Sequence, residues 1–221
     1  MLLAVDTSTA YVGLAVYDGA QVIGEYIWRS NQHHTVELAP AVAELLARSG
    51  LTTENIQALG VALGPGSFTS LRVGLSLVKG LALARHLPLV GIPTLDIYAA
   101  SQPASKLPLL AAIQAGRGRL AIGWYKSMKN GWQAKGPARV ATVDMLIEEI
   151  QSPSIVCGEF SAQERQRLGQ VETIKLASPA QSVRRPSVLA ELAWARWQNG
   201  DVDDEATLAP IYLHTAEPIP S

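Results

Sequence analysis

One short pattern occurs twice in this sequence: an apolar strand, a polar turn, and a second strand with a Tyr near its end. The first copy begins at Ala4–Asp6 and the second at Ala112–Gln114, and in this superposition Tyr17 falls on Tyr125. Any two β-hairpins share such a pattern, so it fits either a duplicated fold or chance. The order of the surrounding strands and helices therefore has to distinguish duplication from chance.

Hydrophobic periodicity predicts an α/β chain whose element order also restarts. The first half is expected to run strand, strand, strand, helix, strand, helix, strand, helix, over residues 2–5, 11–17, 21–28, 35–47, 56–63, 68–85, 88–92 and 94–100. After a Pro-containing linker at 102–108, strands are expected at 110–113, 119–126, 133–141, 154–157 and 173–176, and helices at 143–150 and 186–199. We therefore expect two units, residues 1–102 and a smaller, degenerate half, residues 103–221.

A duplicated unit of this kind is typical of the actin/hexokinase/Hsp70 (ASKHA) class, in which two ribonuclease-H-like halves with mixed sheets flank a cleft. In that class each half opens with a hairpin whose first strand ends in an Asp that faces metal and phosphate. Asp6, Thr7 and Ser8 fit this position, because the carboxylate can hold a cation or water and the hydroxyls can bind phosphate oxygens. We predict a weak, vestigial phosphate loop here; an Asx or ST turn is the alternative.

The second half lacks the matching carboxylate. Gln114 takes the place of Asp6, and a neutral amide cannot replace a carboxylate as a metal ligand or general base. The turn that follows, residues 115–118, is not rich in hydroxyl groups. We therefore expect no catalytic residue in this chain and no cofactor bound firmly by the chain alone.

Other candidate sites are weak. His33 and Glu37 have helical i, i+4 spacing, but no second His follows at that spacing, so we expect no metal site. Cys157 is interpreted as a small buried residue at a strand end. The run Gly64–Thr69 lacks the Gly-Lys-Ser/Thr of a P-loop, and it either holds an anion at a helix N-terminus or allows close packing.

Overall charge argues against a strong autonomous nucleic-acid binder, because Lys and Arg number 18 against 19 Asp and Glu. A chain that is 48% hydrophobic and nearly neutral is expected to fold rather than remain disordered. A single Cys, the lack of a basic leader and the lack of an apolar run of about 20 residues predict a cytoplasmic protein without a membrane span.

The run Gly64–Gly74, with Lys79–Ala82, Asp6–Ser8 and His34–Thr35, closely resembles the bacterial TsaB (YeaZ) family. The resemblance is firm over residues 1–100 and looser beyond. It implies a part in adding threonylcarbamoyl to N6 of adenosine 37 in tRNAs that read codons starting with A. Where that family commonly has an Asp-Ala-Arg-Arg-like start to its second half, this chain has Gln-Ala-Gly-Arg, which weakens a nucleotide role for its own cleft.

The resemblance also implies partners. Such proteins are degenerate paralogues of the catalytic subunit TsaD, with which they form a heterodimer, and the small ATPase TsaE joins the pair. The metal and the transfer chemistry belong to TsaD, and ATP or ADP would be bound only in the assembled complex. The chain would reach tRNA through that complex, and it would form a homodimer when alone.

The helix expected over residues 71–85 is apolar over more than half of its circumference. One stripe consists of Leu71, Leu75, Val78 and Ala82, and another of Val73, Leu77, Leu81 and Ala84. Since a helix needs only about a 100° stripe to cover its own sheet, the excess is covered by the rest of the chain or by a partner. The resemblance favours a partner, so we predict an interface formed by Val36, Ala39, Val42, Leu46, Leu71, Leu75, Val78 and Ala82.

The sequence therefore favours a non-catalytic scaffold subunit of a tRNA-modifying complex. The alternative is a small-molecule kinase of the same fold that uses Asp6 as its cleft carboxylate. A self-sufficient metalloprotease is a third reading, and the missing pair of His ligands argues against it.

Overall fold

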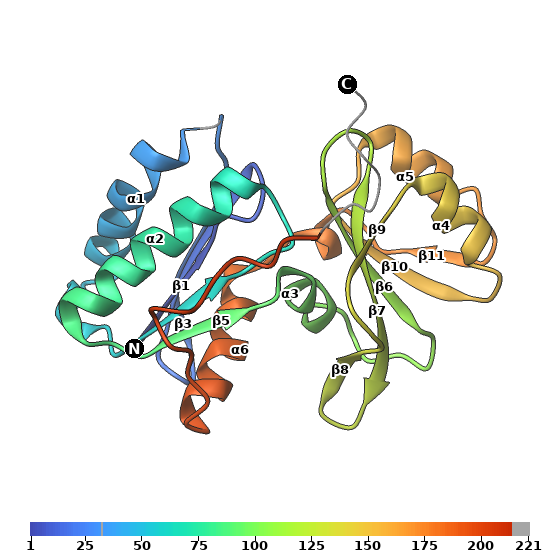
Figure 1. Cartoon of the computed structure of the whole chain (residues 1–221). Coiled ribbons are helices and arrows are strands. Elements are labelled where there is room, and N and C mark those ends of the chain that lie inside the picture. Colours follow the sequence, from blue (N-terminus) through green and yellow to red (C-terminus); the bar gives the residue numbers. More distant parts are fainter. Residues whose placement is uncertain (32, 214–221) are drawn as a thin grey trace.

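The computed structural model describes residues 1–31 and 33–213. It contains two mixed β-sheets, each with helices on both faces (Figure 1). The first half contains β1 (Leu2–Asp6), β2 (Tyr11–Tyr17), β3 (Val22–Arg29), α1 (His34–Arg48), β4 (Ala58–Ala62), α2 (Phe68–Arg85), β5 (Leu89–Ile92) and α3 (Thr94–Ala100). The second contains β6 (Leu109–Gln114), β7 (Leu120–Met128), β8 (Gly131–Ala134), β9 (Arg139–Ala141), α4 (Val143–Glu149), β10 (Ser154–Gly158), α5 (Ala162–Leu168), β11 (Ile174–Leu176) and α6 (Pro186–Gln198). Short 3₁₀ turns lie at Thr53–Asn55 and Ala180–Ser182.

The two sheets share one topology. The first has the order β3-β2-β1-β4-β5, and the second has the corresponding order β8-β7-β6-β10-β11, with β9 paired to β7. In each, the opening hairpin is antiparallel and the next two strands run parallel to the first. This agreement in order and direction confirms the predicted α/β, duplicated ASKHA-like fold.

The two hairpins differ by one residue in register. Asp6 pairs with Gly13 in the first sheet and Gln114 pairs with Leu120 in the second, so the second turn is one residue shorter. Tyr17 and Tyr125 both pack between the two sheets, Tyr17 near α6 and Tyr125 near α3. Leu2 and Ala4 of β1 face α6, whereas Leu110 and Ala112 of β6 face α4 and α5, so Gln114 lies on the opposite face of its sheet from Asp6.

The helices do not divide at residue 102 as the sheets do. Leu189, Ala190 and Ala193 of α6 pack against Leu2 and Ala4 of β1 on the first sheet. Helix α3 lies between the sheets: Leu95, Tyr98 and Ala99 pack on the second sheet, and Ile97 packs against the first. The division into residues 1–102 and 103–221 stays a prediction; in the structure the chain crosses back before α6, so that this helix packs on the first sheet.

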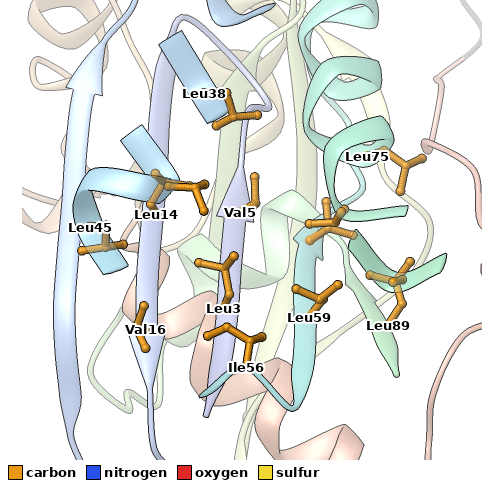
Figure 2. Close-up of a cluster of buried hydrophobic side chains, with 14 of the residues drawn as sticks. Leu3, Val5, Leu14, Val16, Leu38, Leu45, Ile56, Leu59, Leu75 and Leu89 are labelled. Carbon is orange, nitrogen blue, oxygen red and sulfur yellow. The ribbon is translucent and has the colours of Figure 1, made fainter. Parts of the chain in front are cut away.

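Helices α1 and α2 cover the opposite face of the first sheet. The odd-numbered side chains Leu3 and Val5 of β1 point into this layer, where they meet Leu38 and Leu45 of α1 and Leu75 of α2 (Figure 2). Helices α4 and α5 cover the outer face of the second sheet in the same way. The order of layers is α1/α2, first sheet, α6 and α3, second sheet, α4/α5 (Figure 1).

This packing places most of the predicted interface in the chain's own core. Six of the eight residues are at most 6% exposed: Val42, Leu46, Leu71, Leu75, Val78 and Ala82. Only Val36 and Ala39 are exposed. The α2 stripe assigned to a partner is the stripe that covers the sheet, while Val73, Leu77 and Leu81 of the other stripe are half-buried at its edge.

Two local elements differ from expectation. The single strand expected over residues 133–141 is two short strands, β8 and β9, because the segment containing Gly136 and Pro137 interrupts the pairing with β7. Helix α5 was not expected, although Ser161 and Glu164 form a capping box at its start. None of the described helices is long and apolar enough to cross a membrane.

The orientation of α2 leads to a stability prediction. Leu75→Ala removes a side chain that is 6% exposed in the core and should lower the free energy of unfolding by about 2–5 kcal/mol. Leu83→Ala, on the same helix but at a side chain that is 64% exposed, should change it by no more than about 0.5 kcal/mol. Urea denaturation followed by circular dichroism measures both, and equal losses would show that α2 is rotated from this position.

Candidate functional site

The turn between β1 and β2 is buried and internally bonded. One carboxylate oxygen of Asp6, Oδ1, accepts the Ser8 backbone N–H at 2.8 Å. The Thr7 hydroxyl donates to the Ser70 carbonyl at 2.7 Å, and the Ser8 hydroxyl shares a 2.8 Å hydrogen bond with that of Thr94. Asp6, Thr7 and Ser8 are at most 1% exposed, so both hydroxyls serve the fold here. Phosphate binding by these residues stays a prediction, and it would require the turn to give up these bonds.

The glycine-rich run before α2 packs directly on this turn. A Cβ atom at Gly66 would lie 2.2 Å from the Ser8 carbonyl oxygen, and one at Gly74 would lie 2.3 Å from Thr7 Oγ1. The Ser67 backbone N–H also donates to the Ser8 carbonyl at 2.7 Å. Of the two readings of the Gly64–Thr69 run, these contacts favour close packing, because any side chain at Gly66 or Gly74 would displace the turn.

Arg184 occupies the cleft beside Asp6. It lies between the 3₁₀ turn Ala180–Ser182 and α6, and its side chain is only 3% exposed. Its Nε donates to Asp6 Oδ2. Its two terminal nitrogens donate to the Tyr98 hydroxyl at 3.2 Å, the Thr9 hydroxyl at 3.2 Å and the Tyr11 carbonyl at 3.3 Å, and Nη1 lies 3.5 Å from Glu159 Oε2.

The charge of Arg184 changes what this cleft can do. Burial disfavours the cation and is the largest influence, but Asp6, Tyr98 and Glu159 together outweigh it and raise the pKa of Arg184 above its usual value. A permanent guanidinium therefore takes the place beside Asp6 where the kinase reading needs a metal ion or phosphate. The Asp6 carboxylate is already neutralised by it, which argues against that reading.

The corresponding strand end in the second half is also occupied by protein contacts. The Gln114 side-chain amide donates to Glu164 Oε2 at 2.8 Å and to the Glu159 carbonyl at 3.3 Å. Gln114 therefore fixes the segment that leads into α5. Between this segment and Arg184 lies a hollow of about 360 Å³, which is at the small end of the range of about 300–1,000 Å³ usual for ligand pockets.

The histidine and cysteine side chains that the sequence offered as candidates make contacts within the fold. His34 is buried, and its Nε2 lies 3.0 Å from the Thr9 carbonyl oxygen, so it fixes the β1–β2 turn. His33 Nδ1 lies 3.9 Å from Glu37 Oε1. Burial raises the pKa of the Cys157 thiol to about 12. Among the residues that the structure describes, no three His, Cys, Asp or Glu side chains gather closely enough to hold a metal ion.

An open groove separates α1 from α2 on the outer face of the first half. We call it the α1–α2 groove; its volume is about 430 Å³, and it is lined by Thr35, Leu38, Ala39, Phe68, Thr69, Arg72, Val73, Ser76 and Leu77. Phe68 at its end is 52% exposed. The Arg72 guanidinium carbon lies 3.6 Å from the centre of the Phe68 ring, and Nε donates to the Tyr212 hydroxyl at 3.0 Å. The groove is thus a shaped, largely apolar surface.

Sequence reasoning missed the role of Arg184. The pair Arg184–Arg185 fits a solvated basic face, which is the usual setting for short basic pairs. Only Arg185 fits that description: its side chain is 52% exposed and pairs with Glu25. The one available signal was Asp6 itself, because a carboxylate at a buried strand end needs a counter-charge somewhere in the chain.

Removing the Arg184 side chain should lower the free energy of unfolding far more than removing the adjacent Arg185 side chain. Arg184→Ala leaves the Asp6 carboxylate buried without a counter-charge and should lower the free energy of unfolding by about 3–5 kcal/mol. Arg185→Ala, at a partly exposed pair, should cost at most about 1 kcal/mol. Thermal and urea unfolding measure both losses. Equal losses in the two variants would show that Arg184 is not the counter-charge on which the buried Asp6 carboxylate depends.

This chain is similar to known proteins both in sequence and in structure. A family model described as "TsaD: tRNA N6-adenosine threonylcarbamoyltransferase" matches residues 22–179. The tRNA threonylcarbamoyladenosine biosynthesis protein TsaB of Bacillus subtilis is 31% identical over 98% of this chain and 95% of its own length. TsaB of Escherichia coli is 32% identical over 69% of this chain and 67% of its own length. The solved structure of YeaZ from Pseudomonas aeruginosa superposes with a TM-score of 0.75 at 25% identity, over 96% of this chain and 99% of that one.

Similarity over nearly the whole chain, in sequence and in fold, agrees with the motif resemblance that the first half carries. The chain therefore belongs to the TsaB (YeaZ) family and takes part in the biosynthesis of threonylcarbamoyladenosine in tRNA.

Proposed function

We propose that this chain is a non-catalytic partner subunit in that pathway. It docks on the transferase TsaD through the α1–α2 groove, works with the ATPase TsaE, and supports transfer of threonylcarbamoyl to N6 of adenosine 37 in tRNAs that read codons starting with A. The observation that carries the proposal is the groove itself, a largely apolar surface left open on the outer face of α1 and α2.

The groove has the properties of a docking surface. Leu38 and Leu77 give it an apolar floor, Ala39 and Ser76 keep its walls low, and Phe68 is exposed at its end. Small side chains on two adjacent helices allow a third helix to approach closely, and an exposed aromatic ring is a common anchor at interfaces. A pair of helices from a partner would bury this surface in a four-helix arrangement.

The match of residues 22–179 to a TsaD model supports the choice of partner. Two related chains present related helix pairs, so they can pack about an approximate two-fold axis. The same argument applies to a second copy of this chain, which explains why a homodimer would form when TsaD is absent and why the two partners would compete for one surface.

The residues inside the cleft support a non-catalytic role for this chain. Arg184 neutralises Asp6, and β6 ends in the neutral amide Gln114 rather than in a second carboxylate. The metal and the transfer chemistry then belong to TsaD, and ATP or ADP would be bound by surfaces that exist only in the assembled complex.

Charged substitutions in the α1–α2 groove should abolish pairing without unfolding the chain. Ala39→Glu and Ser76→Glu each introduce a carboxylate at an exposed position that a partner would bury. An unpaired buried charge costs about 3 kcal/mol or more, so the affinity for TsaD should fall at least about a hundredfold. Isothermal titration with TsaD measures the loss, and reconstitution with TsaD, TsaE and tRNA should show lower tRNA modification.

A matched control places the same charge on another exposed helix. Met145→Glu on α4, at a side chain that is 48% exposed, should leave both pairing and modification unchanged. Thermal unfolding checks that all three variants are folded. Normal affinity for TsaD in both groove variants would overturn the assignment of the groove, and full tRNA modification without this chain would overturn its role as a required subunit.

A further inference from the structure

The positive charge of this nearly neutral chain is concentrated in one segment. Between Asp96 and Asp144 the sequence contains no acidic residue, and this is its longest stretch without one. The same stretch holds seven basic side chains, Lys106, Arg117, Arg119, Lys126, Lys129, Lys135 and Arg139. It comprises the end of α3, the linker to β6, and strands β6 to β9; Lys126 lies on β7, Lys129 between β7 and β8, and Lys135 directly after β8.

Three of these lysines line one hollow, which we call the lysine hollow. Its volume is about 700 Å³; Lys106 comes from the linker before β6, Lys126 from β7, and Lys135 directly follows β8. The hydroxyls of Ser105 and Ser127 also line it, and no carboxylate does among the described residues. All three lysines are exposed, and none lies within 4.0 Å of a carboxylate in the part of the chain that the structure describes.

A second hollow, of about 360 Å³, continues from the first and shares Pro108 and Lys135 with it. Trp124 and Arg139 line this continuation. Its one acidic residue, Glu149, is already paired with Arg139 and accepts the Trp124 indole N–H at 2.9 Å. The positive charge of the joined surface therefore comes from the three lysines, and the Trp124 indole lies on the continuation that shares Lys135.

We propose that the lysine hollow binds the sugar–phosphate backbone of the tRNA substrate. An ammonium group is a compact point charge that suits phosphate oxygens, and serine hydroxyls can donate to the same oxygens. Protein–protein interfaces are depleted in Lys, so a surface built on three lysines is less suited to an acidic protein. The Trp124 ring next to the lysines offers a stacking surface for an unpaired base.

This inference rests on the proposed function in one respect, that the chain works within a complex which handles tRNA. It also agrees with the overall charge of −1, because three local phosphate contacts add to the affinity of a complex without making the isolated chain a strong binder. The contact is made by the second half, whereas the proposed docking groove lies on the first.

The test uses the reconstituted complex with TsaD and TsaE and an unmodified tRNA that reads codons starting with A. The triple variant Lys106→Ala, Lys126→Ala, Lys135→Ala should weaken tRNA affinity at least about tenfold near 0.1 M salt. The slope of log affinity against log salt concentration should fall by about 2–3, since each lost phosphate contact contributes about 0.7–0.9. Fluorescence anisotropy of labelled tRNA measures both.

A control triple has the same change in net charge at other exposed positions, Arg29→Ala, Arg48→Ala and Lys175→Ala. It should leave tRNA affinity within about twofold of wild type. Equal weakening by both triples would assign the effect to overall charge, and unchanged affinity in the lysine triple would exclude the contact; either result overturns the proposal. Loss of TsaD binding in the lysine triple, seen by gel filtration, would overturn it in favour of a protein partner.

A failure of the proposed docking on TsaD can be distinguished from a failure of the tRNA contact. If the wild-type chain does not assemble with TsaD, the docking proposal fails, and the isolated chain then decides the tRNA contact at low salt. Stronger tRNA binding by the wild-type chain than by the lysine triple, with the control triple behaving like wild type, would support the contact. Equal binding by all three would overturn it.

Discussion

The contact between Arg184 and Asp6 joins parts of the chain that are far apart in sequence, and the arrangement of the two halves depends on it. Asp6 ends the first strand, Tyr98 lies on α3, Glu159 follows β10, and Arg184 reaches all three from the segment in which the chain returns to the first sheet. A buried ion pair of this kind contributes little net stability compared with apolar packing, but breaking it is costly. Its main effect is to fix geometry, because Arg184 is the one cation that pairs with Asp6 among the described residues.

This contact gives the duplicated fold a cleft that is filled by its own side chains. The two sheets keep the same strand order, and each keeps a polar residue at the end of its first strand. In the first sheet that residue is neutralised by Arg184, and in the second it is an amide tied to the start of α5. The glycine-rich run before α2 packs on the same turn. The strand order of the ASKHA-like fold is thus retained, while Asp6 and Gln114 are each held by contacts within the chain.

The sequence predicted the fold and most strand positions well, because both follow from local periodicity and turn chemistry. It was less informative about which surface remains free. Helix α2 has two apolar stripes, and periodicity alone does not state which one its own sheet covers. The stripe through Leu75 and Val78 packs on the sheet, so only the other is left at the groove. Arg184 escaped notice for a related reason: its partner Asp6 is 178 residues away, and no local pattern reports so distant a pairing.

Arg184 neutralises Asp6 inside the cleft, and the outer surfaces of the two halves differ from each other in chemistry. The first half presents a largely apolar groove between α1 and α2, which suits a folded protein partner. The second half presents exposed lysines around a hollow without carboxylates among its described residues, which suits a polyanion. Because net charge averages over both, a value of −1 conceals this separation. If both surfaces bind as proposed, the chain would orient the substrate RNA relative to its protein partner.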